Sequence, residues 1–150
     1  MFYCAASFEE WDMIKILLVD DDPRWLALMA EDAAGTGREL VEAKSESAAL
    51  ERIKSELFDV VVTDLELRPG KEEHGGLTVL KAAKEKDIYT QVIVCTGVGE
   101  PEISVSAIGL GAFDYLEKDP GRVDQSKMLR FKIALALEFR ELKLSTRNRR

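Results

Sequence analysis

The sequence predicts an α/β fold in which five parallel strands form one doubly wound sheet with helices on both faces, a (βα)5 arrangement. Two observations lead to this prediction. Apolar patterns of strand length and of helix length alternate five times along the 150 residues. Three of the strand segments, IKILLV, VVVT and VIVC, are almost continuously apolar. A strand without polar alternation is buried on both faces, as in a parallel sheet covered by helices.

The five predicted strands are short runs rich in β-branched and aliphatic residues, which favour extended structure. They cover Ile14–Val19, Glu39–Ala43, Val60–Thr63, Gln91–Cys95 and Phe113–Leu116. No internal repeat and no long linker interrupts the series, so a single domain is expected.

The first predicted helix begins at Pro23, because proline is favoured at the first helical position, and Asp22 is expected to cap it. Trp25 on this helix, like Trp11, is interpreted as a packing residue. The other helices are expected after Ser45 or Ser47, after Gly75–Gly76, near Pro101, and from about Asp124 to Leu144.

Composition excludes several classes of protein. The net charge of −7 argues against nucleic-acid binding by the domain body. No apolar run approaches the roughly 20 residues of a membrane helix, and the first twelve residues lack the basic region of a secretory signal. Cys95 lies within an apolar run and is interpreted as a buried, reduced thiol. A cytoplasmic location is expected.

Polar residues gather where the predicted strands end. Ligands of open α/β sheets bind at the carboxyl ends of the strands. The residues there are Asp20–Asp22, Asp64, Thr96–Gly97 and Lys118. No glycine-rich loop follows the first strand, which argues against a dinucleotide site and a P-loop.

Converging carboxylates repel one another and favour a hard divalent cation such as Mg²⁺. A carboxylate beside Mg²⁺ can attack a phosphoryl group and become an aspartyl-phosphate. Phosphoryl transfer needs mainly positioning and charge neutralisation, which the Lys118 ammonium and the Thr96 hydroxyl would assist.

Four segments, LLVDDDP, VVVTDLELRPG, VIVCTG and GAFDYLEKDP, occur in that order, each at the end of a predicted strand. Together they resemble the motifs of the response-regulator receiver family of two-component signalling, over roughly residues 13–140. The resemblance implies a flavodoxin-like strand order 2-1-3-4-5, and a sensor histidine kinase or a histidine phosphotransfer protein as phosphodonor.

The resemblance also implies roles for individual residues. Asp20 and Asp21 match the acidic pair that holds Mg²⁺, and Asp64 matches the phosphorylated aspartate. Glu66 matches the position whose backbone carbonyl is a further metal ligand.

Three further positions match the part of the family that responds to phosphorylation. Thr96 matches the hydroxyl residue that contacts the phosphoryl group, and Lys118 the lysine that pairs with it. Tyr115 matches the aromatic residue that switches together with Thr96. The surface expected to change is formed by the fourth helix, the fifth strand and the fifth helix.

The chain departs from the family pattern at three places. The stretch 70–76 is about four residues longer than usual, and its His74 is interpreted as a solvated loop residue. Lys118 is followed by Asp119, where the family usually has proline, often after a cis bond; a cis bond here would cost about 3 kcal/mol more than trans. Residues 1–12 precede the usual start, either as a true arm or through a start codon upstream of Met13.

Two other functions are weighed. A phosphatase of the haloacid dehalogenase type also begins with a strand ending in DxD, which Asp20 and Asp22 satisfy. That class needs a further acidic pair beyond its lysine, whereas Lys118 follows the last predicted strand. A degenerate receiver that only binds proteins is the other alternative, and the complete set of site elements argues against it.

Residues 1–12 are assigned to an N-terminal extension, 13–140 to the receiver domain, and 141–150 to a basic tail or helix extension, with no further domain expected.

The C-terminal helix carries more apolar residues than a helix needs to cover the sheet. An apolar stripe continues along the last helix at Met128, Phe131, Leu135, Phe139 and Leu142, with a second row at Leu137 and Leu144. Either the end frays into a basic tail, or the stripe and the fifth strand form a homodimer surface.

Overall fold

The computed structural model describes residues 13–67, 74–97, 101–118 and 125–147, and all structural statements refer to these ranges. The strands are β1 (Ile14–Val19), β2 (Arg38–Ala43), β3 (Val60–Asp64), β4 (Gln91–Gly97) and β5 (Asp114–Lys118). The helices are α1 (Pro23–Ala33), α2 (Glu46–Ser55), α3 (Gly75–Lys86), α4 (Pro101–Gly109) and α5 (Gln125–Arg147).

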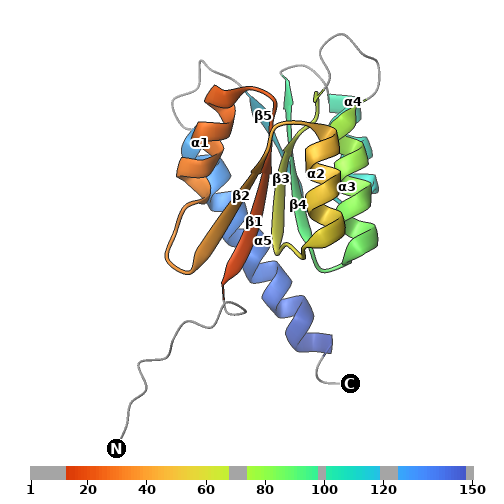
Figure 1. The fold of residues 1–150 in the computed structure, drawn as a ribbon. Coiled ribbons are helices and arrows are strands. Elements are labelled where there is room, and N and C mark those ends of the chain that lie inside the picture. Colours follow the sequence, from red (N-terminus) through yellow and green to blue (C-terminus); the bar gives the residue numbers. More distant parts are fainter. Residues whose placement is uncertain (1–12, 68–73, 98–100, 119–124, 148–150) are drawn as a thin grey trace, which may run out of the picture.

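The strands form one parallel sheet in the order β2-β1-β3-β4-β5, which confirms the predicted fold class and strand order (Figure 1). α1 and α5 pack on one face, and α2 and α3 pack on the other. Side chains alternate between the two faces along each strand: on β1, Leu17 faces α2 and α3, whereas Ile16 and Leu18 face α1 and α5. Burial on both faces explains the continuous apolar runs.

Local capping sets where α1 and α2 begin. Asp22 accepts a hydrogen bond from the Arg24 N–H at 2.9 Å, which confirms its predicted role as N-cap. Of the two serines considered for α2, Ser45 is the cap, because its hydroxyl accepts from the Ala48 N–H at 3.1 Å.

β5 lies further along the chain than predicted. Its pairing with β4 extends to Thr96↔Glu117 and Gly97↔Lys118, so Lys118 is the last residue of the strand rather than a residue after it. The strand is at the edge of the sheet, and two of its five residues are exposed while the other three are half-buried. Its polar end therefore carries no apolar signal that would mark it as a strand.

α5 packs one row of side chains against the sheet and leaves the predicted apolar stripe outside. The fully buried row facing the sheet is Leu129, Ile133 and Ala136, with Leu137 of the second row packed beside it. All five residues of the predicted apolar stripe are exposed instead. Although α5 has 23 residues, no helix in the described ranges is apolar over the length that a membrane crossing requires.

Candidate functional site

The carboxyl ends of β1, β3 and β5 bring three charged side chains to one place. Ile16 and Leu18 of β1 face α1 and α5, and Asp20 is the next residue in that alternating row. Val60 and Val62 of β3 lead in the same way to Asp64. The strand period of two therefore aims both carboxylates toward the same side of the sheet edge.

Asp20, Asp21 and Asp64 form an acidic cluster. Each offers a carboxylate oxygen, and these atoms all lie within 4.8 Å of one another. Asp20 is fully buried and Asp64 is 7% exposed, whereas Asp21 is exposed. The oxygen-only donors fit a hard cation such as Mg²⁺, and such an ion would relieve the mutual repulsion of the carboxylates.

Lys118 joins the acidic cluster from β5. Its Nζ lies 2.5 Å from Asp20 Oδ2 and 3.2 Å from Asp64 Oδ1, and its side chain is 13% exposed. Burial acts to lower the pKa of Lys118, but the hydrogen bond to Asp20 and the charges of Asp64 and Asp20 outweigh it and raise the pKa. The ammonium therefore stays protonated and bridges the ends of β1 and β3.

The two buried carboxylates hold their protons more tightly than usual. Burial raises the pKa of Asp64 to about 6, with Lys118 opposing the change and the charge of Asp20 adding to it. Burial also raises the pKa of Asp20, against its hydrogen bond from Lys118. A single ammonium does not compensate the clustered carboxylates, so the pocket favours added positive charge.

Thr96 contributes a buried hydroxyl without a partner. The residue is 1% exposed, and among the described residues its Oγ1 has no hydrogen-bond partner. Buried polar groups are nearly always hydrogen-bonded. An unpaired hydroxyl in the strand between Asp64 and Lys118 suits a ligand that brings its own acceptor oxygens.

Tyr115 lies on β5 with 39% of its surface exposed. The register pairs Val94 with Tyr115 and Thr96 with Glu117. Paired residues of parallel strands point to the same face, so Tyr115 and Thr96 share a face on neighbouring strands. This placement is compatible with coupling between them, and the switch role stays a prediction.

His74 does not behave as the solvated residue that was expected. It directly precedes α3, its side chain is 26% exposed, and its Nδ1 lies 2.5 Å from Glu66 Oε1. The backbone of Glu66 acts to lower the pKa of the Asp64 carboxyl, while the role of the Glu66 carbonyl as a metal ligand stays a prediction. Residues 70–73 of the lengthened stretch 70–76, the Lys118–Asp119 bond and residues 1–12 lie outside the described ranges.

Cys95 pairs with Asp64 in the β3–β4 register and offers an alternative nucleophile at the same place. It is a free, buried cysteine, as predicted. Burial raises the pKa of its thiol to about 12, so the reactive thiolate does not form near neutral pH. Asp64 is therefore the better candidate nucleophile at this edge.

Trp25 is closer to the site than its interpretation as a packing residue implied. The Lys118 Nζ lies over its ring, 5.0 Å from the centroid. The sequence places Trp25 in the first turn of the helix that follows Asp20 and so near the site, but it does not encode the contact with Lys118.

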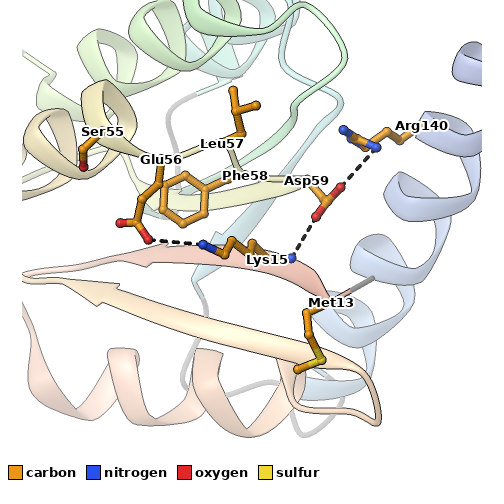
Figure 2. A pocket seen from close by; sticks show the side chains of 8 residues that line it. All are labelled: Met13, Lys15, Ser55, Glu56, Leu57, Phe58, Asp59 and Arg140. Atoms are coloured by element: carbon orange, nitrogen blue, oxygen red, sulfur yellow. Dashed lines mark hydrogen bonds and ion pairs between the residues drawn. The ribbon is translucent and has the colours of Figure 1, made fainter. Parts of the chain in front are cut away.

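A separate hollow of about 580 Å³ lies at the opposite edge of the sheet, where the strands begin (Figure 2). Its charged side chains are already paired: Lys15 Nζ with Glu56 Oε1 at 3.5 Å, and Arg140 with Asp59 at 3.1 Å. Because these pairs neutralise one another, the hollow offers a ligand no excess of charge. The ion pair between Arg140 and Asp59 instead links α5 to the segment that precedes β3.

Comparisons with known proteins agree with this geometry. The family model "Response regulator receiver domain" matches residues 16–130. The chain is 31% identical over 108 residues to the chemotaxis protein CheY of Bacillus subtilis, covering 71% of this chain and 87% of CheY. It is 33% identical over 107 residues to the transcriptional regulatory protein ZraR of Escherichia coli, but that match covers only 23% of ZraR.

Solved structures show the same likeness. A CheY-like receiver domain protein from Methanospirillum hungatei aligns with a TM-score of 0.74 and 27% identity, covering 87% of this chain and 98% of that one. NtrX from Brucella abortus, solved with ADP, aligns with a TM-score of 0.78 and 30% identity, covering 92% of this chain and 30% of NtrX. The strand order, the acidic edge and the extent of the family match agree, and the chain belongs to the response-regulator receiver domain family.

Proposed function

We propose that this chain is a phosphoacceptor switch in which Asp64 takes a phosphoryl group from a sensor histidine kinase or a histidine phosphotransfer protein. A carboxylate oxygen of Asp64 attacks phosphorus and forms an O–P bond while the N–P bond of the phosphohistidine breaks. The imidazole then leaves with the bonding electron pair and takes up a proton. Self-catalysed transfer and hydrolysis are the only chemistry proposed for the chain.

The observation that carries this proposal is the arrangement around Asp64. Its carboxylate lies 3.2 Å from the Lys118 ammonium and within 4.8 Å of carboxylate oxygens of Asp20 and Asp21. Asp20, Asp21, Asp64 and the Glu66 carbonyl are proposed to hold Mg²⁺, which would neutralise phosphoryl oxygens when bound. Lys118 and the unpaired hydroxyl of Thr96 would bind the remaining oxygens.

Phosphorylation is proposed to act through Thr96 and Tyr115. A phosphoryl group adds negative charge beside Thr96 and Lys118 and draws both toward Asp64. Movement of Thr96 opens space for Tyr115, which is outward in this structure, to turn inward. The population of the surface formed by α4, β5 and α5 then shifts.

Self-association is a second proposal, and the exposed stripe on α5 favours it. Met128, Phe131, Leu135, Phe139 and Leu142 are all exposed along that helix. Contiguous exposed apolar surface marks an interaction site more often than scattered residues do. A homodimer through β5 and α5 would bury the stripe.

ZraR and NtrC are named as transcriptional regulators, the latter as DNA-binding, and the chain spans 23% of each. With a net charge of −7, this chain is proposed to act in the cytoplasm without binding nucleic acid itself.

The test is incubation with Mg²⁺ and acetyl phosphate, followed by mass spectrometry of the intact protein. The wild-type chain should gain one acid-stable, alkali-labile phosphate, and Asp64→Asn should gain none while keeping its fold. Asp22→Asn is the matched control in the same pocket region, because asparagine also caps helices, and it should be labelled normally. Absence of label on the wild type would indicate a degenerate receiver, and turnover of added phosphomonoesters would indicate a phosphatase.

A further inference from the structure

The indole of Trp25 is a neighbour of Lys118 that the family motifs do not supply. The ammonium lies 5.0 Å from the ring centroid. Within about 6 Å of an aromatic face a cation is attracted by the ring quadrupole, more strongly once the cation is removed from water. The Lys118 side chain is only 13% exposed, so the attraction operates in its stronger, desolvated form.

Trp25 is held in place by the acidic turn itself. The Asp22 N–H donates to Asp20 Oδ1 at 2.9 Å, and Asp22 Oδ1 accepts from the Arg24 N–H at 2.9 Å. The other oxygen of Asp20 accepts from Lys118. The start of α1, Asp20 and Lys118 are therefore one hydrogen-bonded unit, and Trp25 is carried on its first helical turn.

The Trp25 indole is uncharged, whereas Asp20 and Asp64, which also contact the Lys118 ammonium, are carboxylates. Asp20 and Asp64 are also the groups proposed to engage a cation and a phosphoryl group, so their hold on Lys118 changes as the site fills. Among the contacts that the described residues make with the Lys118 Nζ, the indole is the uncharged one. Its attraction for the ammonium does not compete with metal or phosphoryl binding.

We propose that Trp25 is a positioning residue, whose ring keeps the Lys118 ammonium where it meets the phosphoryl group. The inference rests on the proposed function and adds to it a group from α1. The residue after Lys118 is Asp119, where the family usually has proline. The Trp25 ring constrains the position of Lys118 without requiring a proline after the lysine.

Two substitutions distinguish a role of the Trp25 aromatic face from a role of its apolar packing alone. Trp25→Leu keeps an apolar side chain without a π face, and Trp25→Phe keeps a π face of smaller area. Binding of beryllofluoride, a mimic of the phosphoryl group, is measured by titration calorimetry at saturating Mg²⁺, and binding of Mg²⁺ alone is measured separately. Trp25→Leu should weaken beryllofluoride binding about tenfold, Trp25→Phe should restore most of it, and Mg²⁺ affinity should change less than about twofold.

A purely structural role for Trp25 gives a different pattern. Disturbing the start of α1 would move Asp20 and Asp21, so Mg²⁺ affinity would fall together with beryllofluoride affinity, and that result overturns the proposal. Equal beryllofluoride binding by wild type and Trp25→Leu overturns it as well. Leu28→Ala, on the exposed side of the same helix, is the matched control and should bind both ligands as the wild type does.

A third measurement needs no change at Trp25. The chain has two tryptophans, so Trp11→Phe leaves Trp25 as the sole indole. Its emission should change when beryllofluoride is added after Mg²⁺, because the ammonium beside the ring changes its other partners. An unchanged emission contradicts the inference while the proposed function stands, provided that the same protein is labelled by acetyl phosphate. If the wild-type chain takes no label, the proposed function itself fails.

Discussion

A β-carbon added to Gly76 would stand 2.2 Å from the carbonyl oxygen of Asp64, far inside van der Waals contact. The Gly76 N–H also donates to the Leu65 carbonyl at 3.0 Å. The first turn of α3 therefore rests directly on the backbone that carries the phosphoacceptor candidate. Glycine is needed at this position because of the close approach.

Gly76→Ala should consequently lower the free energy of unfolding by about 2–3 kcal/mol, since the helix must move away from β3. Gly109→Ala is the matched control, because among the described residues no heavy atom outside its own helix backbone lies within 4 Å of the added β-carbon. It should change stability by no more than about 0.5 kcal/mol. Urea denaturation of both variants measures the difference, and equal midpoints would show that α3 does not bear on Asp64.

Mg²⁺ should stabilise the fold through the acidic cluster. A ligand that binds only the folded state at a hundred times its Kd adds about 2.7 kcal/mol, which for a domain of this size raises Tm by roughly 5–10 °C. Asp21→Asn should reduce that shift, and Asp22→Asn should retain it. A melting temperature that does not respond to saturating Mg²⁺ would exclude the metal site as proposed.

Asp32 should make stability depend on pH. Its side chain is 5% exposed, its nearest cation is Arg130 at 3.9 Å across the α1–α5 contact, and burial raises its pKa to about 6. Because this pKa exceeds the unfolded value near 3.9, the folded state binds the proton more tightly. The free energy of unfolding therefore falls as pH rises from about 4 to about 6.

Asp32→Asn removes this titration. At pH 7 the variant should be more stable than the wild type by about 1–3 kcal/mol, and the difference should shrink toward pH 4. Chemical denaturation at a series of pH values measures it. A wild type that is the more stable protein at pH 7 would show that the Asp32 carboxylate has partners that compensate its burial.

Phosphorylation should alter protection around β5. Amide exchange with and without beryllofluoride should differ over residues 97–118, because Thr96 and Tyr115 lie on one face of neighbouring strands. Thr96→Val removes the hydroxyl but keeps the shape, so it should abolish most of the difference. Identical exchange in the wild-type chain would rule out the proposed switch.

The apolar stripe of α5 should control self-association. Replacing Phe131 and Leu142 together by serine removes two of its most exposed members and should leave a monomer. Leu28→Ser, exposed on α1, serves as the control and should associate as the wild type does. Light scattering at high concentration, with and without beryllofluoride, decides; a wild type that stays monomeric in both conditions refutes the dimer.

The sequence by itself determined the fold class, and the resemblance of its motifs to the receiver family supplied the strand order. Strands buried on both faces are continuous apolar runs, which alternate with helical patterns along this chain. Asp22 marks the start of α1 by a local hydrogen bond that needs no tertiary information, whereas the choice of Ser45 over Ser47 for α2 came from the structure. Asp20, Asp64, Thr96 and Lys118 were singled out as candidates because they lie at or just after the ends of predicted strands. Parallel strands bring their carboxyl ends to one edge, so a residue's position at a strand end already places it.

Tertiary structure decided what depends on distance between elements. The contact of Trp25 with Lys118 joins α1 to β5, and no periodicity along the chain encodes it. The pairing of His74 with Glu66 arises because the start of α3 returns to the end of β3. On α5, two apolar rows compete for the sheet, and packing against α1 and β4 buries the row of Leu129 and Ile133. Spacing identifies such rows, but only the neighbouring surface selects which one is buried.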